Sequence, residues 1–197
     1  MRLRGMPVFP RNMVLGCIRD NKLLYEYGRE VARQCRQIGV QVNFAPVADV
    51  NINPENPVIN TRSFGEDPIQ VADKVIAYAS GLESGGVLSV CKHFPGHGDT
   101  LEDSHSGYAN CRKNMEELKE CELQPFDAGI SAGASFVMAG HISLPEILGD
   151  QTPASLSHEI ISGVLREEMG FEGVIITDAL NMGAISENYS SDEAVVR

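Results

Sequence analysis

The stretch that decides the fold reads Gly86-Val-Leu-Ser-Val-Cys-Lys-His-Phe-Pro-Gly-His-Gly-Asp-Thr100 and continues Leu-Glu-Asp-Ser-His105. Its first part, Gly86–Val90, is short and apolar, which is typical of a buried strand. Pro95 and Gly96 then end regular structure. Ionisable side chains crowded just beyond the C-terminal end of a buried strand are typical of the active sites of α/β enzymes.

Strand-like and helix-like segments alternate along the rest of the chain. The predicted strands are 40–50, 86–92, 134–142 and 173–178. The predicted helices are 23–38, 68–83, 115–132 with a break at Pro125, and 157–169, which begins at a capping Ser157. Strands that are apolar on both faces and separated by helices indicate a parallel sheet.

The polar residues at the strand ends favour one barrel architecture over its rival. They are Asp49, Lys92, His93, His141 and Asp178. In a (β/α)8 barrel all strand ends surround one pocket, whereas a doubly wound sheet concentrates its site at one switch point. Because every predicted strand ends in a polar group, we expect an α/β fold of the (β/α)8 type.

The composition excludes several classes of function. The chain has 197 residues, with 16 Lys and Arg against 27 Asp and Glu, which gives a net charge of −11. The only basic cluster, Arg2 and Arg4, is too small to neutralise phosphates, so neither nucleic acid nor an anionic membrane is expected as a partner. No apolar run reaches about eighteen residues, so no membrane-spanning helix is predicted.

Cofactor and structural-metal motifs are missing from the sequence. The five cysteines form no Cys-x-x-Cys pair, which disfavours structural zinc and favours free thiols in a reducing compartment. Neither Gly-x-Gly-x-x-Gly nor a phosphate-binding Gly-x4-Gly-Lys-Ser/Thr loop occurs. We therefore predict no bound cofactor.

A metal site is one chemistry open to the quoted cluster. Nitrogen and oxygen ligands could come from His93, His97, Asp99, Asp103 and His105. His93 and His97 have the spacing of a helical zinc pair, but the intervening Pro95 and Gly96 prevent one regular helix face. A metal-dependent hydrolase stays an alternative, although we predict no metal ligands.

A serine nucleophile is a weaker alternative. Ser104 is adjacent to His105, and neighbours in sequence seldom reach the hydrogen bond that a catalytic triad requires. No Gly-x-Ser-x-Gly elbow is present.

A carboxylate nucleophile paired with a histidine acid/base fits the residues better. Asp178 ends a buried strand, where an ionised carboxylate can form a covalent intermediate. Asp103 and His105 lie two residues apart, so their side chains point the same way in an extended loop. A carboxylate bonded to one imidazole nitrogen leaves the other free to exchange a proton near neutral pH. This set of groups suits glycosyl transfer by double displacement, with histidine in place of the second carboxylate.

Five segments carry a resemblance to a known family. The motif Lys92–Thr100 with Asp103-Ser-His105 resembles the signature of family 3 glycoside hydrolases of the β-N-acetylglucosaminidase (NagZ-like) branch. The other matching segments are Asn43–Val50, Asn56–Gly65, Phe136–Ile142 and Gly173–Met182. The likeness runs from about residue 2 to residue 185.

The resemblance implies a barrel enzyme that removes terminal β-linked N-acetylglucosamine, often from peptidoglycan fragments, by a retaining mechanism. It implies Asp178 as nucleophile and His105 as acid/base with Asp103 as its partner. The sugar would be bound by Arg62, Lys92, His93 and Arg2. Water or phosphate could resolve the intermediate, and a catalytically inactive binding remnant is the non-enzymatic alternative.

Four of these polar residues also have purely structural interpretations. Arg62 could pair with Glu66 or Asp67, and Asp49 could cap a turn. His97 is expected to hold the glycine turn, which contains Gly96 and Gly98, by hydrogen bonding. His141 could be a hydrogen-bonded core histidine.

The family pattern also predicts the extent of the domain. Two strand–helix units of the family barrel would precede Met1 and further units would follow Arg197. We therefore expect residues 1–197 to be a partial family 3 N-terminal barrel domain, about half of the barrel, truncated at both ends. Such a half-barrel would expose two edge strands and an apolar interior, and would be poorly stable and inactive alone.

Overall fold

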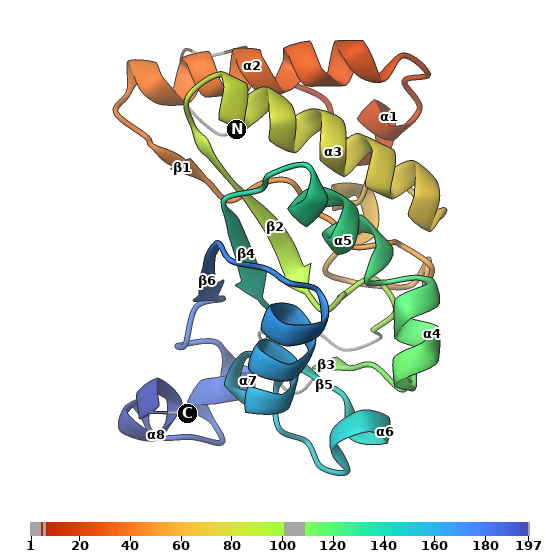
Figure 1. The fold of residues 1–197 in the computed structure, drawn as a ribbon, viewed down its shortest axis with the longest axis vertical. Helices are drawn as coiled ribbons and strands as arrows, with labels where there is room; N and C mark the ends of the chain where they lie inside the picture. Colours follow the sequence, from red (N-terminus) through yellow and green to blue (C-terminus); the bar gives the residue numbers. More distant parts are fainter. Residues whose placement is uncertain (1–4, 6, 101–108, 197) are drawn as a thin grey trace.

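The computed structural model describes residues 5, 7–100 and 109–196. Its centre is a four-stranded sheet in the order β1-β2-β4-β6, in which every neighbouring pair is parallel (Figure 1). The strands are β1 (Val42–Asn43), β2 (Leu88–Phe94), β4 (Phe136–Ala139) and β6 (Val174–Thr177). The strands follow their order in the chain across the sheet, with helices between them, which confirms the predicted parallel α/β pattern.

The longer helices pack on the sheet and on one another. They are α2 (Asn21–Gln37), α3 (Pro68–Ser84), α5 (Gln124–Ser131) and the π-helix η3 (Glu159–Glu168). Figure 1 shows α2 and α3 running alongside each other, with α5 next to α3. The short elements are α1 (Asn12–Gly16), η1 (Asn60–Arg62), α4 (Met115–Glu120), α6 (Pro145–Leu148), η2 (Ala154–Leu156), α7 (Gly183–Ser186) and α8 (Ser191–Val196), with β3 (Ala109–Asn110) and β5 (Ile142–Ser143).

Local sequence signals explain where α3 begins and how closely α2 and α3 pack. Asp67 accepts a hydrogen bond from the Gln70 amide at 2.9 Å, and Pro68 occupies the first turn of α3, as predicted. A side-chain carbon at Gly28 would lie 2.7 Å from the Tyr78 carbonyl oxygen, and one at Gly81 would lie 2.3 Å from another backbone carbonyl. The two helices therefore approach at a distance that only glycine permits.

Two predicted strands are shorter than expected. The segment 40–50 contributes only Val42–Asn43 and a bridge from Val47 to Lys92, because Pro46 has no amide hydrogen for the ladder. The segment 134–142 divides into β4 and β5, and β5 pairs with β3 in a separate two-stranded sheet.

The predicted helices agree more closely with the structure than the predicted strands do. The break near Pro125 is confirmed, because α4 ends at Glu120 and α5 begins at Gln124. The last helix begins at Glu159, although Ser157 still accepts a hydrogen bond from the Ile160 amide at 3.3 Å.

The core lies between the sheet and its helices. Phe94 of β2 meets Phe126 of α5 edge to face, with 5.3 Å between ring centroids. By contrast, apolar side chains are exposed at β1 and β6, the outer strands of the described sheet: Phe44, which directly follows β1, is 54% exposed, and Val174 of β6 is 50% exposed. The expected pair of open edge strands is therefore present in this part of the chain. None of the described helices has the length and apolar character needed to cross a membrane.

Candidate active site

A bulge at the end of β2 directs His93 toward the candidate site. Lys92 pairs with Met138 and Phe94 pairs with Ala139, so His93 has no partner on β4. An extra residue in a strand re-aims its side chain, and such bulges are frequent beside active sites. Phe94 can thus face the helices while His93 turns toward the loop that follows β1.

Asp49 is the buried centre of this loop. It is fully buried, and its carboxylate accepts hydrogen bonds from the His93 ring Nδ1 (2.7 Å), the His93 amide (3.2 Å) and the His97 amide (2.7 Å). Burial by itself raises the pKa of Asp49, but its interactions with His93 and His97, these hydrogen bonds among them, outweigh it and lower the pKa. Asp49 therefore clamps both ends of the segment 93–97, which is more than the turn cap expected of it.

The glycine turn has a second set of bonds. Thr100 Oγ1 lies 2.6 Å from His97 Nδ1, and Asn56 Nδ2 donates to the carbonyl oxygens of His97 (2.7 Å) and Thr100 (2.9 Å). Burial lowers the pKa of His97, against the opposing pull of Asp49. The structural role predicted for His97, which is to hold this turn, is confirmed.

Arg62 comes from η1 and reaches the same place. Its Nη1 donates to the Val58 carbonyl oxygen at 3.0 Å, and its Nη2 lies 3.4 Å from His93 Nε2. Arg62 thus contacts Val58 and His93, whereas its structural alternative was an ion pair with Glu66 or Asp67.

Lys92 lies among the charged residues of the site. Burial lowers the pKa of Lys92, and the positive charge of Arg62 lowers it further, while the carboxylates of Asp178 and Asp49 act in the opposite direction. Three predicted strand-end or site residues, Arg62, Asp178 and Asp49, therefore lie within electrostatic range of its ammonium group. A cavity of about 400 Å³ opens beside Lys92 and Arg62 and is walled by aromatic side chains that include Phe44.

Asp178 follows β6 directly. Its amide donates to the Ala139 carbonyl oxygen at 2.9 Å, and its Oδ1 accepts from the Ala179 amide at 2.8 Å. The next turn is held by His141, whose Nε2 lies 3.0 Å from the Ala179 carbonyl oxygen and whose Nδ1 lies 2.7 Å from Ser155 Oγ. His141 is 1% exposed and is confirmed as a hydrogen-bonded core histidine.

Three predicted site residues lie outside the described residues. They are Arg2, Asp103 and His105, and Ser104 lies there too. Within the described residues, no group of three or more His, Cys, Asp and Glu side chains is arranged to hold a metal ion.

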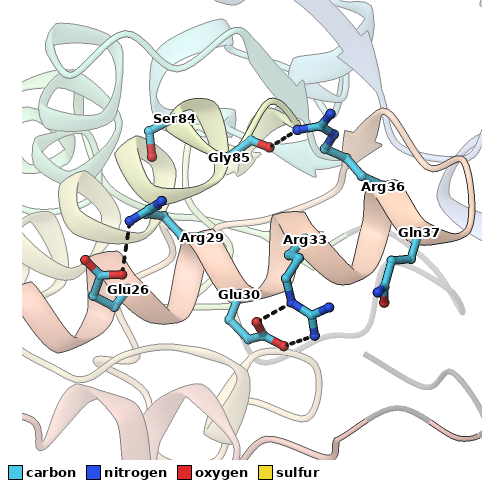
Figure 2. Close-up of a pocket in the computed structure, with 8 residues that line it drawn as sticks. All are labelled: Glu26, Arg29, Glu30, Arg33, Arg36, Gln37, Ser84 and Gly85. Atoms are coloured by element: carbon cyan, nitrogen blue, oxygen red, sulfur yellow. Dashed lines mark hydrogen bonds and ion pairs between the residues drawn. The ribbon is translucent and has the colours of Figure 1, made fainter.

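A second hollow lies at the opposite end of the sheet (Figure 2). It is lined by α2 and by Ser84 and Gly85, which precede β2, whereas the candidate site follows β2. Its arginines already have partners: Arg29 pairs with Glu26, and Arg33 pairs with a neighbouring glutamate. In barrels this N-terminal face serves stability, and catalysis belongs to the other face.

Sequence reasoning missed two features near the glycine turn. Asn56 was expected only as part of a matching segment, yet it ties 97–100 to the chain before η1. The buried pair of Glu122 Oε1 and Lys113 Nζ, 2.5 Å apart, also went unpredicted. The one available signal was a glutamate between apolar positions at the end of a short helix.

Known proteins resemble this chain along its whole length. The family described as Glycosyl hydrolase family 3 N terminal domain matches residues 1–197. Beta-hexosaminidase A of Pseudoalteromonas piscicida is 38% identical over 177 residues, covering 84% of this chain and 30% of that protein.

Solved structures of family 3 enzymes are also similar to this chain. A family 3 β-N-acetylglucosaminidase from Paenibacillus sp. str. FPU-7 is 42% identical, with a TM-score of 0.96 over 99% of this chain and 37% of its own. Zinc-bound CbsA from Thermotoga neapolitana is 37% identical, with a TM-score of 0.92 over 98% of this chain and 41% of its own.

The chain thus spans less than half the length of these relatives. Their fold makes the four parallel strands part of a (β/α)8 barrel, as predicted. The chain belongs to the family of glycosyl hydrolase family 3 N-terminal domains.

Proposed function

We propose that this protein is a glycosidase that removes terminal β-linked N-acetylglucosamine, with peptidoglycan fragments among its substrates. The observation that carries the proposal is the gathering of Arg62, Lys92, His93 and Asp178 at the C-terminal ends of the parallel strands. The curated and solved relatives, which are named β-hexosaminidases and β-N-acetylglucosaminidases, support the substrate class.

The chemistry proceeds by double displacement. The Asp178 carboxylate attacks the anomeric carbon, so that a carbon–oxygen bond to the enzyme forms while the bond to the leaving group breaks. His105, oriented by Asp103, protonates the departing oxygen and then takes a proton from water. Water attacks the same carbon and releases Asp178, which restores the enzyme with retained stereochemistry.

The binding groups have complementary hydrogen-bonding characters. Arg62 and Lys92 are donors only, so they bind hydroxyl and acetamido oxygens. The partly buried position of Lys92 strengthens these bonds, because fewer water molecules compete for its ammonium group.

Asp178→Asn tests the nucleophile. In the full-length protein, which carries the whole barrel, turnover of nitrophenyl N-acetyl-β-glucosaminide should fall at least about 1,000-fold, since no other carboxylate ends β6. Asp192→Asn, which changes an exposed carboxylate on α8, is the matched control and should keep wild-type turnover. Mass spectrometry of the trapped enzyme should find the sugar on Asp178, and an adduct on Asp103 would refute the assignment.

His105→Ala tests the acid/base. Substrates with poor leaving groups need a proton for departure and should slow strongly, whereas nitrophenyl glycosides should slow less in the first step. An equal loss for both would show that His105 binds substrate without donating the proton.

Two alternatives are resolved in the same assay. Because zinc-bound CbsA is a relative, activity is measured before and after chelation with EDTA. Loss that zinc restores would favour the metallohydrolase. Release of a sugar 1-phosphate when phosphate is added would favour phosphorolysis over hydrolysis.

A further inference from the structure

The two neighbours of the His93 ring determine which of its nitrogens carries the proton. Nδ1 lies 2.7 Å from Asp49 Oδ2, and Nε2 lies 3.4 Å from Arg62 Nη2. An ionised carboxylate can only accept hydrogen bonds, and a guanidinium group can only donate them. The proton of the ring therefore belongs on Nδ1, and the lone pair belongs on Nε2.

The backbone makes this arrangement hard to change. The Asp49 carboxylate also accepts from the amides of His93 and His97, so both of its oxygens are engaged. Ala48, beside it, donates to the Lys92 carbonyl oxygen at 2.7 Å, and Ser63 Oγ donates to the Asp49 carbonyl oxygen at 2.7 Å. Asp49 is fully buried and His93 is 4% exposed, so no bulk water competes.

The consequence concerns what the site can recognise. Arg62 and Lys92 offer only donors, whereas Nε2 of His93 offers an acceptor next to the Arg62 donor. A sugar hydroxyl fits such a pair if it takes the place of the long 3.4 Å contact between them, because its hydrogen can then be given to Nε2 while its oxygen accepts from Arg62. A site built to bond a hydroxyl discriminates strongly against a substrate that lacks it, because the buried groups are then left unpaired.

We propose that Asp49 is a positioning residue which fixes the Nδ1–H tautomer of His93, so that Nε2 accepts a hydrogen bond from a substrate hydroxyl. The recognition half of this statement rests on the proposed function, whereas the tautomer half does not. Asp49 itself touches no substrate; it acts through the ring and through the 93–97 segment that it clamps.

The tautomer is tested by nitrogen NMR of the full chain with ¹⁵N-labelled histidine. The five histidines give few signals, and His93 is assigned by comparison with His93→Gln. Wild-type protein at pH 7 should show a protonated Nδ1 and an unprotonated Nε2. A protonated Nε2 in the wild-type protein overturns the proposal, even if no variant folds.

Asp49→Asn is the informative variant. An amide has one acceptor oxygen and one donor nitrogen, so it cannot accept from the ring and from both backbone amides. The Nδ1–H population of His93 should fall measurably. The control is Glu122→Gln, which also neutralises a fully buried carboxylate but one bonded to Lys113, and it should leave the His93 signals unchanged. Unchanged signals in Asp49→Asn overturn the proposal.

Recognition is tested with a panel of monodeoxy nitrophenyl N-acetyl-β-glucosaminides. Wild-type kcat/KM should collapse for one analogue, and Asp49→Asn should reduce that discrimination at least tenfold while Glu122→Gln preserves it. An equal loss on every substrate in Asp49→Asn means a structural role only and overturns the recognition half. If the wild-type protein with its whole barrel cleaves no substrate of the panel, the proposed function fails, and the NMR result still decides the tautomer.

Discussion

Two buried carboxylates flank the same glycine turn, and they differ in charge preference. Asp49 and Glu122 are both fully buried, and a side-chain carbon at Gly96 would lie 2.6 Å from Glu122 Cβ and Cγ. Burial raises the pKa of Glu122, and the opposing pull of Lys113 does not cancel this effect. The pKa of Asp49 is lowered in spite of burial.

The number of donors explains the difference. Asp49 accepts from a ring nitrogen and two backbone amides, so both oxygens are engaged. Glu122 is bonded to Lys113 through Oε1, whereas its buried Oε2 has no hydrogen-bond partner among the described residues. The charge state of a buried carboxylate thus follows from its hydrogen-bond partners, and burial alone does not determine it.

The largest effect on stability is expected from Asp49→Ala. This change leaves the His93 ring and the amides of His93 and His97 without their acceptor, and the free energy of unfolding should fall by about 3–5 kcal/mol. Urea unfolding monitored by circular dichroism measures it. Ser155→Ala, which removes one partner of buried His141, is the reference and should cost only about 1–2 kcal/mol. A loss below that of Ser155→Ala would contradict the clamp described here.

The pH dependence of stability should separate the two carboxylates. Because the folded-state pKa of Asp49 lies below its ordinary 3.8, its contribution is present above pH 3.8 and is lost as pH falls through the lowered value. The folded-state pKa of Glu122 lies above its ordinary 4.5, so its contribution is present below pH 4.5 and is lost as pH rises through the raised value.

Urea unfolding between about pH 3 and pH 8 tests these opposite slopes. Asp49→Asn should remove part of the acid-side loss, and Glu122→Gln should remove part of the loss on the neutral side. The same slope in wild type and Glu122→Gln would show that Lys113 keeps Glu122 ionised at its ordinary pKa.

The smallest effect is expected from Gly96→Ala. The φ angle of Gly96 is +134°, and the added carbon would meet Glu122 Cβ and Cγ, so a cost of about 1–3 kcal/mol is expected. Gly39→Ala, at φ +78° with no atom within 4 Å, is the reference for a positive-φ substitution that meets no neighbouring atom. A smaller cost for Gly96→Ala than for Gly39→Ala would contradict the contact with Glu122.

Sequence by itself determined the features that depend on neighbouring residues. Apolar runs and helix signals such as Asp67-Pro68 and Pro125 predicted the alternation of strands and helices, because burial and capping act over a few residues. The motif from Lys92 to His105 indicated the family. The roles of Asp178, Asp103 and His105 remain predictions from that motif.

Tertiary structure alone decided how the site is held. Asp49 lies 44 residues from His93, and Arg62 lies 31 residues from it; both meetings depend on the bulge in β2 and on the bridge from Val47 to Lys92. Strand register and bulge position arise from packing between distant segments, which no local pattern encodes. For the same reason, the sequence did not predict the pairing of Lys113 with Glu122, or the contrast between the two buried carboxylates.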